Sequence, residues 1–234
     1  ARVVPDMFQL NLSRVSVDDL GGVPLIGLKA TRFTETGRMA KRMLDLGLTM
    51  VCLPLLLPLL ALLVLVVRLD SGAPIFFTQK RVGRKGETFR IIKFRSMSVG
   101  AEGQQQALSG LNQASGPLFK IRDDPRLTPV GRWLRRSSLD ELPQLINVLR
   151  GEMSLVGPRP GLPQEVEQYK RWHRQRLDVL PGITGLWQVS GRSEVAFDEM
   201  CLLDIYYLEN WSLTMDIVLI IRTIPKVFLG RGAY

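Results

Sequence analysis

The most prominent feature of the hydrophobic pattern is an uninterrupted apolar segment from Leu46 to Val67, 22 residues without a charge. At about 1.5 Å of rise per residue, a helix of this length extends roughly 33 Å, which is enough to cross a bilayer. A buried core helix is the alternative for such a segment. The length and the leucine content favour a membrane helix.

Two prolines and the flanking charges bear on how this helix would lie in a membrane. Pro54 and Pro58 are four residues apart in its centre, where each removes a backbone hydrogen bond and favours a kink. Both flanks are basic, with Lys41 and Arg42 before the segment and Arg68 after it, so the positive-inside rule keeps both ends cytoplasmic. A re-entrant helix broken at Pro58 satisfies both observations. A plain span remains the alternative, because prolines also occur in spanning helices.

The remaining pattern predicts an α+β, mainly helical fold with a small β-hairpin. Two short strands, one after Pro74 and one at residues 89–95, flank a turn at residues 83–86. Residues 101–116 are polar and rich in Gln, Ser and Gly, as in a lid or an ordinary surface loop. Rigid loops are expected at residues 157–161 and 181–185, and helices at 131–136, 142–150, 163–177 and, in a helix-rich region, 197–228.

By composition the chain divides into three segments. Residues 1–37 mix short apolar stretches with turns and end in a polar linker, as expected for the tail of a preceding soluble domain in a longer protein. Residues 38–70 are the expected re-entrant membrane helix, and residues 71–234 form a domain that carries the polar chemistry. Within it, residues 211–218 have the pattern of an interfacial amphipathic helix, although core packing explains them nearly as well.

Positive charge is concentrated in two blocks. Lys and Arg number 31 against 22 acidic residues, a net charge of +9, and the excess lies between Lys80 and Arg95 and between Lys120 and Arg136. Such blocks are typical of proteins with an anionic partner: nucleic acid, an anionic membrane surface or a phosphorylated substrate. On charge alone, a solvated basic face is the alternative.

Histidine and cysteine are too scarce for several kinds of chemistry. His173 is the only histidine, and the two cysteines are Cys52, inside the apolar segment, and Cys201. This composition excludes a zinc site and a histidine-based triad, makes a disulfide unexpected, and fits a reducing compartment. Acid–base or nucleophilic chemistry is therefore left to carboxylates.

Two adjacent carboxylates, Asp140 and Glu141, follow a run of arginines and precede a helical pattern that ends at Gly151. Ser138 and Glu141 match a capping box, whose role would be structural, although Pro143 restricts where the helix can begin. At a helix N-terminus beside arginines, both carboxyl pKa values are expected to be lowered, which suits a nucleophile or a metal ligand. The local pattern supports function and capping equally.

Several basic residues are placed to bind phosphate. Lys93 and Arg95 alternate with apolar residues, so on a strand they would point to the same side. Arg159 lies in the loop Gly157-Pro158-Arg159-Pro160, where the prolines restrict the backbone and reduce the entropy lost on binding. Arginine forks are a usual means of holding a diphosphate, but basic residues on a solvated strand face are the commoner case.

Seven motifs occur in an order that is typical of one protein family. They are Lys41-Arg42 with Asp45, residues 74–83 (PIFFTQKRVG), 93–97 (KFRSM), 138–144 (SLDELPQ), 147–149 (NVL), 153–160 (MSLVGPRP) and 181–192 (PGITGLWQVSGR). In these motifs the chain resembles the bacterial sugar transferases, the monotopic polyprenyl-phosphate phosphoglycosyl transferases that start exopolysaccharide and O-antigen assembly. The resemblance covers roughly residues 38–234. It implies the catalytic unit of a larger member, of the undecaprenyl-phosphate hexose-1-phosphate transferase type.

The resemblance implies a two-step transfer of a hexose-1-phosphate from a UDP-sugar to polyprenyl (undecaprenyl) phosphate. Asp140 matches the nucleophile, which would form a covalent phosphosugar–aspartyl intermediate with release of UMP, and Glu141 matches its partner. Both acids would take part in binding Mg²⁺, the implied cofactor. Residues expected to contact phosphate or to line the nucleotide-sugar site are Lys93, Arg95, Arg135, Pro158, Arg159, Gln188 and Arg192.

The resemblance also implies where the protein works. The apolar segment matches the family's re-entrant helix with its bend at Pro58, in the bacterial inner (cytoplasmic) membrane, and the active site would lie on the cytoplasmic face. The implied partners are membrane lipids, polyprenyl phosphate and a UDP-sugar, with glucose or galactose favoured; nucleic acid is not among them, and a homodimer is expected by analogy. The alternative is a non-catalytic membrane-tethered module that binds polyanions or serves as an assembly scaffold.

Overall fold

The computed structural model describes residues 15–20, 23–28, 33–104, 106–113, 116–119, 121–191 and 195–229. It is mainly helical with three two-stranded sheets, which confirms the predicted mixture of helices with a small amount of strand. The elements, with η for short 3-10 turns, are β1 (Val15–Leu20), β2 (Val23–Leu28), α2 (Glu35–Ser71), β3 (Phe76–Val82), η1 (Arg84–Gly86), β4 (Thr88–Phe94), η2 (Ser109–Leu111), α3 (Pro129–Ser137), η3 (Leu139–Gln144), α4 (Leu145–Arg150), β5 (Ser154–Val156), α5 (Pro163–Glu167), η4 (His173–Asp178), β6 (Gly182–Thr184), α6 (Leu186–Ser190), α7 (Phe197–Asn210) and α8 (Leu213–Leu229).

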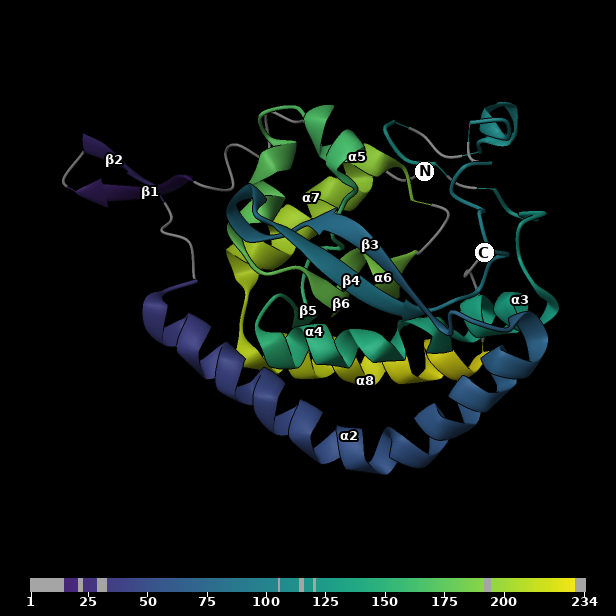
Figure 1. Cartoon of the computed structure of the whole chain (residues 1–234). Coiled ribbons are helices and arrows are strands. Elements are labelled where there is room, and N and C mark those ends of the chain that lie inside the picture. Colours follow the sequence, from purple (N-terminus) through teal and green to yellow (C-terminus); the bar gives the residue numbers. More distant parts are fainter. Residues whose placement is uncertain are drawn as a thin grey trace.

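The apolar segment forms the centre of one long helix, α2, which extends beyond it at both ends. The Thr34 hydroxyl accepts the Gly37 N–H at 3.1 Å and caps the N-terminus, so the last residues of the expected linker are helical. Pro54 and Pro58 both lie inside the helix, which is bent near its middle (Figure 1). The expected break is therefore a bend in a continuous helix.

Buried polar side chains hold the N-terminal arm of α2 against the rest of the chain. Lys41 Nζ lies 2.7 Å from Asp216 Oδ2 of α8, and both side chains are buried. The Tyr207 hydroxyl donates to the same carboxylate at 2.6 Å. Asp45 accepts the Leu155 N–H of β5 at 3.2 Å. Moving the N-terminal arm of α2 away would leave these buried charges without partners, which is strongly destabilising. The contacts therefore hold the arm in one position.

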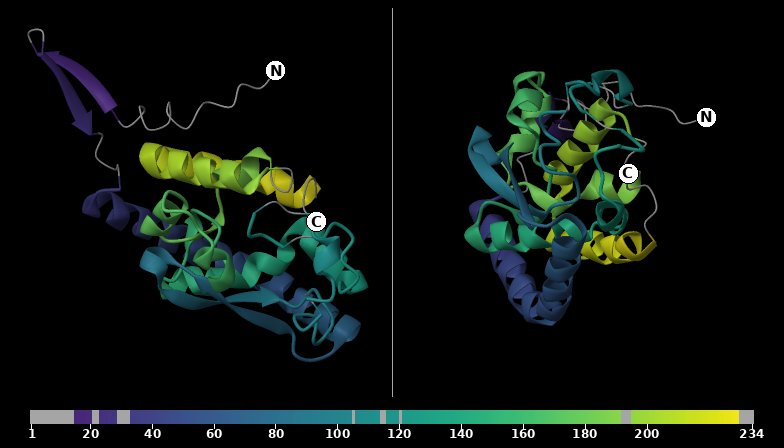
Figure 2. Two further views of the ribbon diagram at one scale, coloured as in Figure 1. Left: turned by 90° about the horizontal axis from the view of Figure 1, so that it is seen from above. Right: turned by 45° about the vertical axis from the view of Figure 1, so that its right-hand side comes forward.

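The C-terminal arm of α2 returns to the same globular body. Leu63 and Val67 are buried in a cluster with Phe94 of β4 and Leu134 of α3. A straight helix of 37 residues would extend about 55 Å. The bend, seen from a second side in the right-hand view of Figure 2, is what allows both arms to pack on one body.

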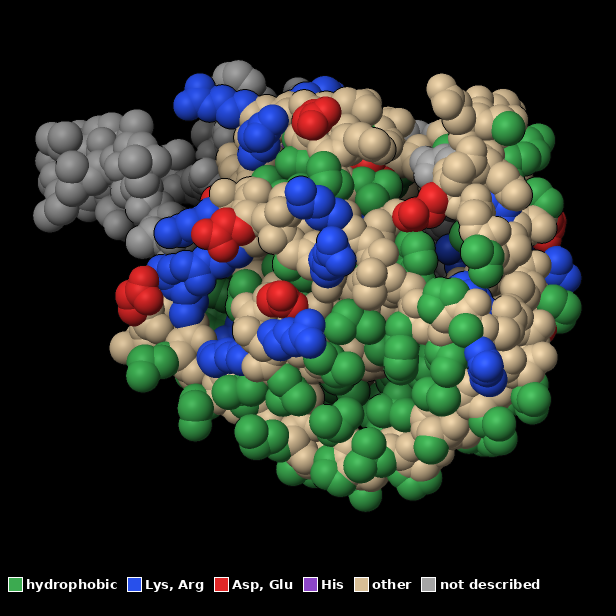
Figure 3. Space-filling model, viewed as in Figure 1, with side chains coloured by type: hydrophobic (Ala, Val, Ile, Leu, Met, Phe, Trp, Pro, Cys, Tyr) green, Lys and Arg blue, Asp and Glu red, His purple; other side chains and the backbone are tan. Residues whose placement is uncertain are grey.

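The middle of α2 is exposed and apolar. Leu55 is 76% exposed, and Val51, Leu57 and Leu62 are also exposed. Among the described residues α2 is the one helix that is long and apolar enough to cross a membrane, and only 11% of its most apolar stretch is buried. Hydrophobic side chains cover the lower face of the molecule in Figure 3, where α2 lies. The interpretation of this segment as a buried core helix is therefore wrong.

Short sheets position the loops that carry the polar motifs. β3 and β4 form the expected antiparallel hairpin, with Phe77 opposite Lys93. The expected loop at 181–185 contains a strand instead, because β6 pairs in parallel with β5. A Cβ on Gly182 would lie 2.0 Å from the Gly157 backbone nitrogen, so only glycine allows this close approach.

The prediction of a single charged helix at residues 163–177 is wrong. The structure has the short helix α5, a break, and then η4. At the break, the Lys170 N–H donates to His173 Nδ1 at 3.1 Å. His173 and Arg176 are buried, because tertiary contacts draw these polar side chains inward and outweigh the local helical preference.

The helix-rich C-terminal region is confirmed as α7 and α8. α8 has two faces: Asp216 and Leu219 are buried, whereas Ile217, Ile221 and Ile224 are 44–58% exposed. The predicted interfacial stretch 211–218 is therefore half core and half surface. Its exposed half continues along α8 as an apolar stripe.

Candidate active site

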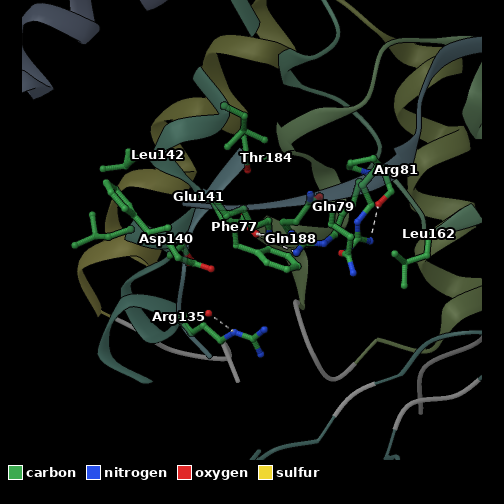
Figure 4. Close-up of a pocket in the computed structure, with 18 of the residues that line it drawn as sticks. Phe77, Gln79, Arg81, Arg135, Asp140, Glu141, Leu142, Leu162, Thr184 and Gln188 are labelled. Atoms are coloured by element: carbon green, nitrogen blue, oxygen red, sulfur yellow. Dashed lines mark hydrogen bonds and ion pairs between the residues drawn. The ribbon is translucent and has the colours of Figure 1, made fainter. Parts of the chain in front are cut away.

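One cavity of about 1360 Å³ brings together most of the residues that the sequence singled out. The hairpin β3–β4 forms one wall, and η3 places the two carboxylates against it (Figure 4). Pro158 is buried and does not line the cavity, and Arg192 lies outside the described residues. The predicted residues that do line it are Lys93, Arg95, Arg135, Asp140, Glu141, Arg159 and Gln188.

The dyad lies on the 3-10 turn η3 and not at the N-terminus of an α-helix. Ser138, the residue before this turn, has a left-handed backbone with φ 56°, and its N–H donates to the Arg135 carbonyl at 3.1 Å. This conformation is unfavourable for a residue with a Cβ, and such residues are concentrated at functional sites. Here it ends α3 and turns the chain so that Asp140 and Glu141 reach the cavity.

Glu141 is bound by two cations. Its Oε1 accepts Lys93 Nζ at 2.5 Å and Arg159 Nη2 at 3.0 Å, and its side chain is 14% exposed. Burial opposes ionisation of Glu141, but Arg159 and Lys93 outweigh it and hold the pKa of this carboxyl well below its usual range. The Ser138 side chain makes no capping hydrogen bond, so the predicted capping box is wrong.

Asp140 is buried but has no cation bound to it. It is 6% exposed and makes no hydrogen bond or ion pair within the part of the chain that the structure describes. Burial raises its pKa to about 6, with a further contribution from the Glu141 charge, although Lys93, Arg135 and Arg159 act in the opposite direction. The expected lowering of both pKa values is therefore wrong for Asp140, because loss of solvation outweighs the nearby positive charges.

Two further arginines that line the cavity are held in different ways. The Arg135 side chain makes only long contacts, from Nε to Ser96 Oγ at 3.3 Å and from Nη2 to the Met97 sulfur at 3.9 Å, and in Figure 4 it lies below Asp140. Arg95 Nη2 instead donates to the Ser71 carbonyl at 2.6 Å at the end of α2. Its Nε and Nη1 are buried without a hydrogen-bond partner among the described residues.

Arg159 is held by a residue that sequence reasoning missed. Arg176 Nη2 donates to the Arg159 carbonyl at 3.2 Å, and Arg176 is ion-paired with Asp204. Arg176 and Asp204 are both buried. The loop is also fixed from the other side, where the Pro158 carbonyl accepts the Gly182 N–H at 2.9 Å. Arg176 could not be distinguished in sequence from the basic residues around it.

The hairpin supplies three further residues that were missed. Phe77, Gln79 and Arg81 alternate along β3 and line the cavity on the same side as Lys93 (Figure 4). Arg81 donates to the Pro160 carbonyl at 3.2 Å and to Gln79 Oε1 at 2.7 Å. The period of two in the strand was the signal that could have found them.

Gln188 is a predicted residue whose buried amide is unsatisfied within the described ranges. Its Nε2 and Oε1 are buried and make no hydrogen bond among the described residues. A Cβ on Gly185 would lie 2.6 Å from this Oε1, so glycine leaves room for the amide. An unsatisfied buried amide on a cavity wall is a candidate ligand contact, because burial without a partner is otherwise costly.

The carboxylates form a pair and not a metal cluster. Within the described ranges no group of three or more His, Cys, Asp or Glu side chains could hold a metal ion. Both Glu141 contacts use Oε1, so Oε2 and the Asp140 carboxylate are the oxygens that remain for a cation. Mg²⁺ is often bound through one or two carboxylates together with substrate phosphates, and the pair fits that pattern.

Comparison with known proteins shows the family. Residues 36–230 match the family described as bacterial sugar transferase, and the chain belongs to that family. The match covers the cavity and α2, and leaves out most of the N-terminal segment.

Named relatives agree with this assignment. The chain is 42% identical over 233 residues to the galactosyl transferase CpsE of Streptococcus agalactiae, covering 96% of this chain and 52% of that protein. It is 37% identical over 240 residues to the UDP-glucose:undecaprenyl-phosphate glucose-1-phosphate transferase of Escherichia coli, covering 99% and 49%. With the exopolysaccharide production protein ExoY of Sinorhizobium fredii the identity is 42% over 202 residues, covering 85% and 89%. The chain thus spans about half the length of the first two proteins and most of the third.

The two carboxylates should have opposite effects on stability. At pH 8, Asp140→Asn should raise the free energy of unfolding by about 1–3 kcal/mol. The reason is that folding of the wild type buries an ionised carboxylate, and the raised pKa of Asp140 measures the cost of doing so. This gain should shrink as pH falls below about 6, where wild-type Asp140 becomes protonated. Glu141→Gln should lower stability by about 3 kcal/mol, since Lys93 loses its buried partner. Denaturation of the detergent-solubilised protein measures both, and equal signs would contradict this electrostatic assignment.

Proposed function

We propose that this chain transfers a hexose-1-phosphate from a UDP-sugar to polyprenyl phosphate. The observation that carries the proposal is Asp140, a buried carboxylate without a hydrogen-bond or ion-pair partner among the described residues. It lies in a cavity whose cations Lys93, Arg135 and Arg159 can hold a diphosphate. The names of the CpsE and E. coli relatives support the substrate class and leave glucose and galactose as the two leading sugars.

The reaction proceeds in two displacements at one phosphorus atom. An Asp140 carboxylate oxygen attacks the sugar-linked phosphorus, the bond to the bridging oxygen breaks, and UMP leaves with that oxygen. A phosphate oxygen of the acceptor then attacks the same phosphorus and displaces the Asp140 carboxylate. The products are polyprenyl-diphosphate-sugar and the original enzyme, with no change in oxidation state.

Glu141 is assigned a positioning role in this chemistry. Its ion pairs hold Lys93 and Arg159 beside Asp140, where their charges can stabilise the oxygens of the transferred phosphoryl group. Arg135, with only long contacts, is the third cation available to phosphate. When bound by Asp140 and Glu141, Mg²⁺ would neutralise charge on the diphosphate.

An alternative function, polyanion binding by a membrane-tethered module or scaffold, accounts less well for the dyad. Basic side chains alone would serve that purpose. Burying Asp140 without a partner among the described residues lowers the stability of the fold, and its negative charge would repel a bound polyanion. A residue that is costly in both respects is better explained by a catalytic role.

We also propose that α2 is re-entrant and that the chain works at the cytoplasmic face of the bacterial inner membrane. Support comes from the two arms of α2, which contact one body through Lys41 at one end and Leu63 and Val67 at the other, while the apolar middle is exposed. A plain span would place these ends on opposite sides of the bilayer. A homodimer remains a prediction by analogy.

Removing the nucleophile should abolish the first displacement. Asp140→Asn should reduce UMP release from UDP-glucose or UDP-galactose, with Mg²⁺ and undecaprenyl phosphate, by about 10³-fold or more. Asp123→Asn, which removes an exposed acid that does not line the cavity, is the matched control. Unchanged turnover by Asp140→Asn would rule out the nucleophile assignment.

The rate of the first displacement should fall at acidic pH. Because the pKa of Asp140 is raised to about 6, single-turnover UMP release should fall as pH decreases through that value and the carboxylate becomes protonated. In Glu141→Gln the acid limb should move to lower pH, because a neighbouring negative charge is gone and Lys93 and Arg159 can act on Asp140 instead. A shift in the opposite direction would contradict the coupling.

Both ends of α2 should be accessible from the same side of the membrane. In a Cys52→Ser background, Glu35→Cys and Leu69→Cys introduce one exposed thiol at each end of the helix. An impermeant maleimide should label both in inside-out vesicles and neither in right-side-out vesicles. Labelling from opposite sides would establish a plain span.

A further inference from the structure

The cavity that holds the dyad extends into a second, apolar region between α2 and α8. On α2 the lining residues are at positions 48, 49, 52 and 56, a spacing that keeps them on one side of the helix. On α8 they are at positions 220, 223 and 224, which likewise share one side. We call this region the apolar arm, and it is lined by Leu48, Thr49, Cys52 and Leu56 of α2 and by Ile220, Thr223 and Ile224 of α8.

The apolar arm differs chemically from the rest of the cavity. None of its seven lining residues is charged, whereas the region around Asp140 contains Lys93, Arg135 and Arg159. A nucleotide sugar carries charge and hydroxyl groups over its whole length, so it belongs in the charged region. The total volume, about 1360 Å³, also exceeds the roughly 300–1000 Å³ typical of a site for one small molecule.

The arm reaches the exposed apolar surface of the molecule. Cys52 and Ile224 line it and are themselves exposed. On the outer faces of the same two helices, Leu55 and Ile221 are exposed and do not line the cavity. A flexible hydrocarbon chain could therefore pass from a bilayer around α2 and α8 into the cavity without crossing a charged side chain.

We propose that the apolar arm binds the isoprene units nearest the phosphate of the polyprenyl phosphate acceptor. This inference rests on the proposed function, since it requires the acceptor phosphate to reach the phosphorus bound to Asp140. With the phosphate held there, the chain must leave along an uncharged wall. The arm provides such a wall and leads to the exposed apolar faces of α2 and α8.

Neighbouring residues on each helix provide matched tests. Leu56→Trp and Ile224→Trp add bulk inside the arm, whereas Leu55→Trp and Ile221→Trp add the same bulk on the outer faces. Each full-length variant is assayed in lipid nanodiscs with UDP-sugar and Mg²⁺ while the mole fraction of undecaprenyl phosphate is varied. Single-turnover UMP release without acceptor is measured on the same samples, because the first displacement requires no acceptor.

The lining variants should raise the half-saturating mole fraction of undecaprenyl phosphate by at least about tenfold, because each tryptophan displaces apolar contacts with the chain. The outer-face variants should match wild type, and the effect should be confined to the second displacement. Equal behaviour of lining and outer-face variants would overturn the arm as the chain site. Absence of UMP release by wild type itself would instead overturn the proposed function.

Cys52 allows binding to be measured independently of turnover. Cys52 and Cys201 are both free, and Cys201 is buried, so a maleimide should report on Cys52 alone. In the Asp140→Asn protein, undecaprenyl phosphate should slow Cys52 labelling at least about threefold relative to nanodiscs of phospholipid alone. Equal labelling in the two membranes would mean that ordinary acyl chains fill the arm and would overturn the proposal.

Discussion

The ion pairs from Lys93 and Arg159 to Glu141 are the interaction on which the rest of the site depends. They compensate one buried carboxylate, whereas its neighbour Asp140 is buried without a partner in the part of the chain that the structure describes. The pKa values of the two acids consequently move in opposite directions, downward for Glu141 and upward for Asp140. Two adjacent and chemically similar side chains thus become different, one a fixed counter-ion and the other a candidate nucleophile. Among the described residues Glu141 forms ion pairs with Lys93 and Arg159, whereas at Asp140 burial outweighs the nearby positive charges.

This arrangement must be supported from outside the dyad, because a buried charge without a partner weakens the fold. The left-handed Ser138 backbone turns the chain into the cavity, and the buried Arg176–Asp204 pair holds the Arg159 loop. Arg95 joins the end of α2 to the strand that carries Lys93. The arginines therefore differ in role: Arg95 and Arg176 hold backbone carbonyls, whereas Arg159 forms an ion pair with Glu141 in the cavity.

The long helix α2 and the cavity form one arrangement. Because both arms of α2 pack on the same body, its inner face contributes to the cavity while its outer face remains exposed and apolar. The site therefore combines a charged region with an apolar arm, next to a surface suited to a bilayer. A reaction between a water-soluble nucleotide sugar and a lipid phosphate needs a charged environment and an apolar environment next to each other in one site.

The sequence by itself determined the class of fold, the long apolar helix, the hairpin and the identity of the charged residues, because these follow from periodicity, length and local motifs. It also indicated the dyad and five further residues that line the cavity, through the resemblance to a family. Tertiary structure decided the rest: that Glu141 pairs with cations instead of capping a helix, that burial raises the Asp140 pKa, that the 163–177 segment is not one helix, and that Arg176 supports Arg159. These outcomes depend on solvation and on contacts between residues distant in sequence, and a local pattern contains neither.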